Sequence, residues 1–473
     1  MYDYCLESTV SMPDTDPSST TSQPRRWVLL WLLAVAQLML ILDITIVAIA
    51  LPLMGDELGL TRGPLTWIIS AYTLTFGGLM LLGGRLADTV GARTIVLAGL
   101  AIFTVSSLTI GLAPDGALAI AGRVGQGLGA ALLSPSALSW VVALFDGKER
   151  AKALGIWSAL GGGGAAIGVL LGGIVTAIAG WRWAFFLNVP IGIALFVTLV
   201  VLLPRGVRTA GSRSIDLFGG LLVTAATGTL IWVIINAGEA GLWQRANAIA
   251  LVIAIALYIA FVVRQRTART PLMDLGLMTR RPVAAGIFLI FTATALMITV
   301  FFLGSFYFQQ HMGYGPLITG LLFLPVAAAT MIGATLAGNL AARIGLPTLA
   351  ATGLIVAAVG LAVAGLWLTP VVATIGIAVA AAGTGVLFVA ASASALGNVA
   401  PHEAGIASGI VSTFHEFGAS VGAAVMSSVA AVSLAGGTTD GFTAALIVAS
   451  IAAVVAAGVA AMITPRAPKN AAA

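Results

Sequence analysis

Long apolar runs recur along this 473-residue chain, and they constrain its fold more than any other feature. Each run is about 20 residues long, which is the length of helix that crosses the hydrocarbon core of a bilayer. Helices satisfy their own backbone hydrogen bonds, so they are stable where no water is present. Fourteen runs are separated by charged residues, Gly or Pro, near residues 27–50, 64–84, 94–113, 117–144, 152–179, 183–203, 215–237, 245–264, 283–309, 317–342, 347–369, 371–397, 404–432 and 441–463.

The composition agrees with a chain that lives in lipid. Hydrophobic residues make up 59% of it and charged residues only 8%, whereas soluble domains carry about 25% charged residues. The runs are continuous, unlike the alternating segments of about ten residues that build a membrane barrel. We therefore expect an all-α polytopic membrane protein. Its net charge of +5 is explained by basic loops, so we expect no nucleic-acid partner.

The basic residues predict which ends of the spans face the cytoplasm. With the N-terminus inside, all but four of the 22 Lys and Arg residues fall on the cytoplasmic side. Arg62, Arg182 and Arg245 then lie in outer loops, and Arg123 lies within a span. Both termini are expected in the cytoplasm, and residues 1–24, rich in Ser, Thr, Pro and Asp, are expected to be a disordered tail.

Two distant segments repeat at one fixed offset of 254 residues. The segment that begins at Gly84 matches the one that begins at Gly338, and Gly164 matches Gly418. The repeat predicts two six-helix halves with two extra helices inserted between them. The expected parts are a tail (1–24), an N-terminal half (25–205), an inserted linker (206–270), a C-terminal half (271–465) and a second tail (466–473).

Three charged residues lie well inside the predicted spans, away from their ends, where a charge is expensive and needs a partner or a function. Asp43 lies in the first run and Arg123 in the fourth, where it is expected near Asp43 or else extended toward the outer surface. Glu416 follows His415 in the thirteenth run. Glu416 either makes a structural hydrogen bond or forms a second protonatable or cation-binding site. We take Asp43, Arg123 and Glu416 as the candidate proton-coupling residues.

The cytoplasmic loop after the second run carries the candidate gating residues Gly84, Asp88, Gly91 and Arg93. Glycines let helices turn tightly and pack closely. An acid at such a corner can face the N-terminal end of a neighbouring helix. The alternatives are a latch between the halves or a plain tight turn.

Aromatic and polar residues inside the spans are candidates to line a substrate pocket, although most such residues pack or lie at the interface. The candidates are Gln37, Trp67, Tyr72, Phe302, Phe306, Tyr307, His415 and Glu416. The chain has no phosphate-binding loop and no metal-ligand spacing, which argues against ATP as the energy source and against a metal cofactor.

Several motifs resemble those of one transporter family. They are LDITIVAIALP around Asp43, WIISAYTL at Trp67, GGRLADTVGAR, GRVGQGLGAALLSP, WRWAFFLNVPIG at Trp181 and FYFQQHMGYGPLITGLLFLP at Tyr307. Together they resemble the 14-span drug:proton antiporters of the major facilitator superfamily, over about residues 27–463.

The resemblance implies a major facilitator fold in the bacterial cytoplasmic membrane. It also implies export of small amphipathic, often cationic, drugs or antibiotics in exchange for protons, by alternating access. The protein would be a monomer and no enzyme, driven by the proton gradient without a cofactor. Import of a small solute by symport or facilitated diffusion is the alternative on the same fold. A membrane sensor that does not transport is disfavoured, because no soluble domain is evident in the sequence.

Overall fold

A computed structural model describes residues 23–204, 216–241, 243–397, 399–400, 403–434 and 438–465, and within these ranges the structure consists of helices and their connections. Most of the predicted N-terminal tail and all of the predicted C-terminal tail lie outside the described residues. The helix that opens the bundle begins at Gln23, so it includes the last two residues of the predicted tail.

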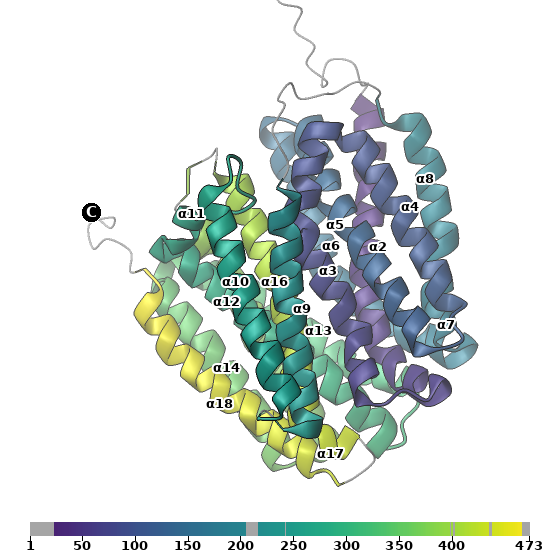
Figure 1. Cartoon of the computed structure of the whole chain (residues 1–473), viewed down its shortest axis with the longest axis vertical. Coiled ribbons are helices and arrows are strands. Elements are labelled where there is room, and N and C mark those ends of the chain that lie inside the picture. The colour runs from purple at the N-terminus through teal and green to yellow at the C-terminus, as the bar shows by residue number, and fades with distance from the viewer. Residues whose placement is uncertain are drawn as a thin grey trace, which may run out of the picture.

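The helices form two sets with a hairpin between them in the chain (Figure 1). The first set comprises α2 (Gln23–Leu58), α3 (Arg62–Val90), α4 (Ala92–Gly111), α5 (Gly116–Leu144), α6 (Gly147–Ala179), α7 (Arg182–Phe186) and α8 (Asn188–Leu202). The inserted pair is α9 (Leu217–Ala240) and α10 (Arg245–Thr267). After the short α11 (Leu275–Thr279), the second set comprises α12 (Arg281–Phe306) with its π-helical end η1 (Tyr307–His311), α13 (Pro316–Ile344), α14 (Leu346–Leu366), α15 (Pro370–Leu396), α16 (Ala404–Val429), α17 (Ala431–Leu434) and α18 (Asp440–Ile463).

Twelve helices in the described part of the chain are long and apolar enough to cross a membrane. Long helices also occupy the two remaining predicted spans. In α6 the apolar stretch among the described side chains is Gly164–Ala179, which is shorter than a span. In α16 apolar residues are interleaved with Ser, Thr, His415 and Glu416. The structure thus supports a multi-pass, all-helical protein, and the count of fourteen spans stays a prediction.

The 254-residue repeat is visible in the helix boundaries. Helices α3, α4 and α5 begin at residues 62, 92 and 116, and α13, α14 and α15 begin at residues 316, 346 and 370. The corner between the first two helices of each trio is a glycine with a positive backbone φ, 112° at Gly91 and 76° at Gly345. L-residues with a side chain rarely adopt this conformation, so glycine is required at both corners.

Close helix packing also repeats at the same offset. A side chain at Gly129 of α5 would strike the backbone of Gly99 and Phe103 in α4. A side chain at Gly383 of α15 would likewise strike the backbone of Gly353 and Ala357 in α14. Small residues let helices in a membrane approach closely, and here the same contact is built twice.

An arginine at the start of each helix set caps the last long helix of that set. Arg25 donates to the carbonyl oxygen of Leu202 at the end of α8 (2.9 Å). Arg281 donates to the carbonyl oxygen of Ile463 at the end of α18 (3.1 Å). The C-terminal carbonyls of a helix favour a cation. We call this end of the bundle, where the described chain also begins and ends, the basic end (Figure 1).

Two helix pairs make the most extensive contacts between the sets. Helices α3 and α16 pack along each other, with Thr66 hydrogen-bonded to Ser427 (2.6 Å) and Gly77 against the Cβ of Glu416. Helix α9 packs against both α3 and α16. The second pair is α6 and α13, which touch through the backbones of Gly173 and Gly320.

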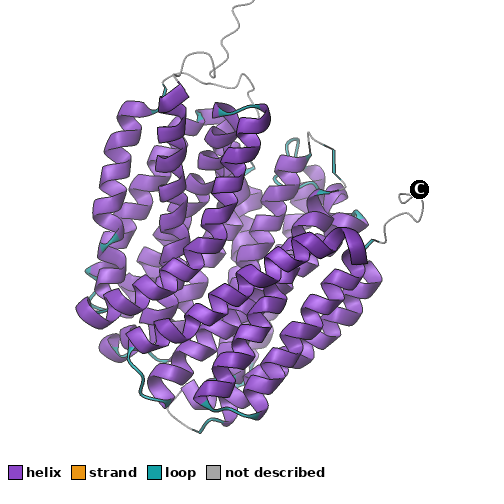
Figure 2. Cartoon of the chain, turned by 180° about the vertical axis from the view of Figure 1, so that it is seen from behind, coloured by secondary structure: helices purple, strands orange, loops and turns teal. Residues whose placement is uncertain are grey.

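The sets separate toward the basic end. Helices α6 and α13 run in opposite directions and touch at Gly173 and Gly320, far from that end. The same antiparallel pairing places Gly155 of α6 opposite Gly338 of α13, nearer the basic end. A methyl group added to either glycine would meet no atom within 4 Å. Figure 2 shows the two sets diverging toward this end. The helix sets therefore touch at the opposite end, which we call the closed end, and diverge toward the basic end.

Candidate functional site

Asp43 lies at the centre of a buried polar network inside the first helix set. Its side chain is fully buried and forms an ion pair with Arg123 of α5, which is 1% exposed. The other carboxylate oxygen, Oδ1, accepts hydrogen bonds from Gln126 Nε2 (2.9 Å) and Asn188 Nδ2 (3.0 Å). Helices α5 and α8 thus supply three side chains to one carboxylate of α2. The expected proximity of Asp43 and Arg123 is observed, and Arg123 does not extend to the surface.

Arg123 is held on all sides. Its Nε donates to the carbonyl oxygen of Ile68 (2.8 Å), and Nη1 also donates to Gln126 Oε1 (2.8 Å). The guanidinium carbon lies 4.3 Å from the ring centre of Tyr72, a cation–π distance. Gln126 Nε2 further donates to Ser107 Oγ of α4 (2.8 Å). The side chain therefore has little freedom to leave Asp43 while these contacts persist.

The donors around Asp43 match a carboxylate and not a carboxylic acid. An ionised carboxylate only accepts hydrogen bonds, whereas a protonated one must donate from one oxygen. Both oxygens of Asp43 face N–H donors, so a proton would have to displace one of them. The arrangement can therefore act as a two-state switch, in which protonation of Asp43 releases Arg123 or an amide.

Sequence reasoning did not single out Gln126, Asn188 or Ser107. Gln126 follows Arg123 by three residues on one helix, which places the two side chains on the same face. That spacing could have predicted that Gln126 shares the surroundings of Arg123. Asn188 opens α8 after the break at Leu187, and the sequence alone does not place that break beside α2.

Glu416 lies on the seam between the helix sets. It is 5% exposed, and its Oε1 is 3.2 Å from Nδ1 of His415. Its Oε2 is buried with no hydrogen-bond partner among the described residues. The His415 side chain is 35% exposed, and its ring centre is 5.8 Å from that of Phe388 in α15. A carboxylate oxygen without a donor is ready to accept a proton or a cation.

The predicted gating loop lies at the basic end. Gly91 forms the corner between α3 and α4, Asp88 is exposed, and Gly84 is half-buried in α3. Arg93 donates to the carbonyl oxygens of Val200 (2.8 Å) and Leu203 (3.2 Å), at the end of α8. These contacts of Arg93 stay within the first helix set, as expected where the two sets have separated.

The predicted pocket residues are not gathered in one place. Tyr72 is fully buried beneath Arg123, and Trp67 packs in a cluster with residues of α9. Phe302 and Phe306 are buried against each other, with ring centres 5.1 Å apart. The Tyr307 hydroxyl donates to the carbonyl oxygen of Leu368 (3.1 Å), and Gln37 Oε1 is buried without a partner among the described residues. The last two predicted residues, His415 and Glu416, lie on the seam as described above.

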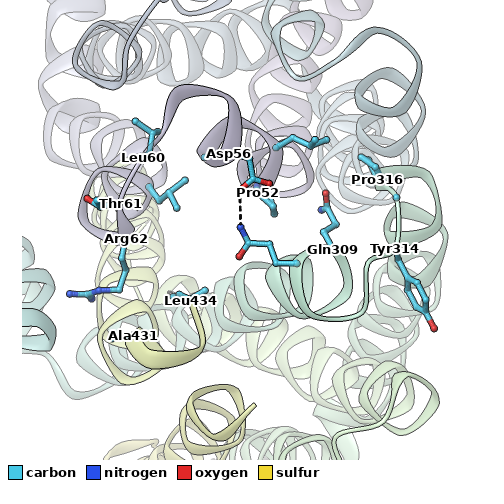
Figure 3. Close-up of a pocket in the computed structure, with 15 residues that line it drawn as sticks. Pro52, Asp56, Leu60, Thr61, Arg62, Gln309, Tyr314, Pro316, Ala431 and Leu434 are labelled. Atoms are coloured by element: carbon cyan, nitrogen blue, oxygen red, sulfur yellow. Dashed lines mark hydrogen bonds between the residues drawn. The ribbon is translucent and has the colours of Figure 1, made fainter. Parts of the chain in front are cut away.

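A pocket of about 910 Å³ lies at the closed end (Figure 3), which we call the pocket end. It is lined by the end of α2, the start of α3, η1, the start of α13, and α17. Gln309 of η1 donates to the carbonyl oxygen of Ile49 in α2 (2.9 Å), and Gln310 lies 3.4 Å from Asp56. Both contacts join the two helix sets. None of the predicted substrate residues lines this pocket.

Comparison with known families decides the class of this protein. Residues 33–423 match the family model of the Major Facilitator Superfamily. The chain belongs to the Major Facilitator Superfamily. This membership accounts for the two helix sets and for the buried charges between helices, since members of this superfamily are transporters.

Relatives of this facilitator chain carry resistance and export names. The puromycin resistance protein pur8 of Streptomyces alboniger is 36% identical over 84% of this chain and 80% of its own length. The cephamycin export protein CmcT of Amycolatopsis lactamdurans is 35% identical over 81% of both chains. The tetracenomycin C resistance and export protein of Streptomyces glaucescens is 33% identical over 70% of this chain and 62% of its own.

Solved structures share the fold of this facilitator chain. A bacterial homologue of the human lysosomal transporter Spinster, inward-facing and unoccupied, has a TM-score of 0.66 and 17% identity, covering 94% of this chain and 97% of its own. A peptide transporter (POT) in complex with sulfate also has a TM-score of 0.66 at 17% identity, covering 92% and 94%. At this identity the likeness shows the fold alone.

Proposed function

We propose that this protein exports amphipathic drugs or antibiotics from a bacterial cell in exchange for protons, by alternating access. The observation that carries the proposal is the buried Asp43–Arg123 pair with its surrounding amides. A charge pair inside a membrane bundle marks an ion or proton path by default. The resistance and export names of the relatives support the drug-like substrate class.

The proposed proton site is Asp43. A proton bound to one carboxylate oxygen makes the side chain neutral and turns that oxygen into a donor. Arg123 would then lose its counter-ion and keep Gln126 Oε1 and the carbonyl oxygen of Ile68 as acceptors. Because Arg123 also contacts α3 through Tyr72, its displacement would shift α3 and α5 relative to α2. Loss of the proton would restore the present arrangement.

The proposed contribution of the second helix set is Glu416. Its free Oε2 and the half-exposed His415 beside it suit the counter-ion of a cationic substrate or a second proton site. Glu416 lies against Gly77 of α3, and α3 also carries Tyr72. Substrate binding at Glu416 and protonation of Asp43 would therefore act on the same helix, which is what exchange requires.

We further propose the orientation and the division of the chain. The basic end would face the cytoplasm, because cytoplasmic loops carry an excess of Lys and Arg, and both termini would lie there. The present structure would then be inward-facing. The fourteen helices would form a monomer of two six-helix halves, 25–205 and 271–465, with the pair within 206–270 inserted between them. Gly84, Asp88, Gly91 and Arg93 would latch the basic end when it closes.

Transport in everted membrane vesicles tests the proposal. In vesicles acidified by respiration, adding a cationic drug substrate should dissipate the pH gradient in the wild type. Asp43→Asn should abolish this response at matched expression, because the amide cannot take up the proton. Asp146→Asn is the matched control, since Asp146 is an exposed acid whose ion pair with Arg150 is also exposed, and it should respond like the wild type.

The same vesicles separate export from import. Antiport releases protons as drug enters the everted vesicle, whereas symport of a solute carries protons in the opposite sense. Full pH dissipation by Asp43→Asn would remove Asp43 from the mechanism. Solute-driven proton movement of the opposite sign would favour the importer.

A further inference from the structure

A buried arginine at the pocket end joins three parts of the molecule. Arg62 at the start of α3 is only 8% exposed, although its place in the sequence predicts an outer loop. Its Nη2 donates to the carbonyl oxygen of Ile235 in the inserted helix α9 (2.7 Å). Its Nη1 donates to Ser428 Oγ in α16 (3.3 Å). One side chain thus connects the first helix set, the inserted pair and the second helix set.

Ser428 completes the junction. Its hydroxyl donates to the carbonyl oxygen of Ile234 in α9 (2.6 Å). Gly238, one turn further along α9, lies so close to Ser428 that any side chain there would strike its backbone. Helix α9 is therefore seated directly on the seam between α3 and α16, at the end where the two helix sets meet.

The inserted pair is braced at this same end. Asn236 of α9 donates to Asn247 Oδ1 of α10 (2.6 Å), and Asn247 donates to the carbonyl oxygen of Gly241 (2.6 Å). Asn247 is fully buried. These bonds hold α9 and α10 together at this end. The carbonyl oxygens of Ile234 and Ile235 are therefore held in fixed positions as hydrogen-bond acceptors.

We propose that Arg62 is a positioning residue through which the inserted pair holds the pocket end closed. For that end to open, α3 and α16 must separate there, because each belongs to a different helix set. The separation takes Arg62 away from Ser428, Ile235 or both. Charge-assisted hydrogen bonds of this kind are about twice as strong as neutral ones, so their loss weighs on the balance between the closed and open states.

The pocket allows Arg62 to leave its acceptors and return, and we call the contacts of Arg62 with Ser428 and Ile235 the Arg62 latch. Arg62 and Leu65 both line the pocket of about 910 Å³, and Figure 3 shows the Arg62 side chain extending away from the cavity toward α9. A guanidinium that leaves its acceptors can rotate into this space, where water can hydrate it. A charge released into an apolar surrounding would have no such alternative.

This inference rests on the proposed function only in assuming that the pocket end opens, and its test needs neither drug nor proton. The probe is a cysteine at Ser427, which is fully buried on α16 against Thr66 of α3 and would face water after these two helices separate. It is placed in a Cys5→Ser background, since Cys5 is the single native cysteine. The rate of its reaction with a polar maleimide is measured on the purified full-length protein in detergent.

Arg62→Gln should raise the labelling rate roughly ten-fold, the factor expected when one charge-assisted hydrogen bond is lost. Ser428→Ala and Gly238→Val should raise it by smaller factors, the first by removing a partner and the second by pushing α9 off the seam. The controls should leave it unchanged. They are Arg245→Gln, which removes an exposed charge at the same end, and Gly228→Ala, which adds a methyl group that meets only a flexible tip of Leu74.

The outcomes decide the point. Equal rates in Arg62→Gln and Arg245→Gln, in proteins that elute as one folded species, would overturn the latch. An unchanged rate in Gly238→Val would overturn the part given to the inserted pair. If Arg62→Gln does not fold, Ser428→Ala and Gly238→Val carry the test. If the wild type exports no drug but the labelling rates change as expected, the role of Arg62 stands and only the proposed function is lost.

Discussion

Arg123 and Asp43, 80 residues apart in the chain, form an ion pair that is closed off from solvent inside the first helix set. The pair does not lie on the seam between the helix sets, where Glu416 lies. The two acids are thus in different settings. Asp43 is saturated by donors, and Glu416 has one oxygen without a partner among the described residues.

Removing one partner of the buried pair should lower the stability of the protein more than removing both partners. Arg123→Gln leaves Asp43 with no counter-ion, and loss of one partner of a buried pair costs about 3–5 kcal/mol of stability. The double variant Asp43→Asn/Arg123→Gln buries no charge at this site and should recover much of that loss without recovering transport. Thermal unfolding of the purified proteins in detergent measures the difference. A double variant less stable than Arg123→Gln would contradict the expectation.

Tyr72 should act through its ring and not its hydroxyl. The ring lies against the Arg123 guanidinium, while the hydroxyl is buried with no hydrogen-bond partner among the described residues. Tyr72→Phe should therefore retain stability and transport. Tyr72→Leu should lower the stability by about 2 kcal/mol, through loss of the cation–π contact and of packing. The comparison is made by thermal unfolding and drug export, and a damaging Tyr72→Phe would assign the hydroxyl a role.

Glu416 should matter most for charged substrates. In Glu416→Gln the free carboxylate oxygen is lost but the shape is kept, so export of dicationic drugs should fall strongly while export of neutral drugs persists. Drug accumulation in an efflux-deficient host checks this at equal expression. His415→Asn is the companion variant, because it removes the imidazole that contacts the Glu416 carboxylate. Equal losses for neutral and dicationic drugs would instead indicate a second proton site or a structural role.

The repeated glycines should respond alike to substitution. Gly129→Ala and Gly383→Ala each put a methyl group against the backbone of the neighbouring helix, and overpacking of this kind costs about 1–3 kcal/mol. Gly155→Ala meets nothing within 4 Å, so it should be neutral or stabilising in the present state. Thermal unfolding of the three variants tests the internal symmetry. A tolerated Gly383→Ala beside a damaging Gly129→Ala would show that the two contacts differ.

Much of the fold could be predicted from residue patterns. The apolar runs near 94–113 and 371–397 correspond to α4 and α15 within a few residues, because lipid demands one continuous helix per crossing. The offset of 254 residues also appears in the helix starts and in the paired contacts of Gly129 and Gly383. These features depend on neighbours along the chain or on a repeated local pattern.

The polar partners depended on the packing. Asp43 and Arg123 stood out in the sequence because a charge in an apolar run is costly wherever the helix lies. Uncharged Asn188 and Gln126 carry no such signal, and only the placement of α8 and α5 beside α2 brings them to the carboxylate. Trp67 shows the same limit, since it packs toward α9 and away from the pocket.

Sequence alone therefore determined the solvent of this protein, the extent of most of its helices, its internal repeat and its costly charges, because each follows from local composition or spacing. Tertiary structure decided how those charges are satisfied. It placed Arg62 under α9 rather than in an outer loop, and it left the helix sets apart at the basic end. Such outcomes depend on which helix faces meet, and helices that are apolar all round leave that choice to packing.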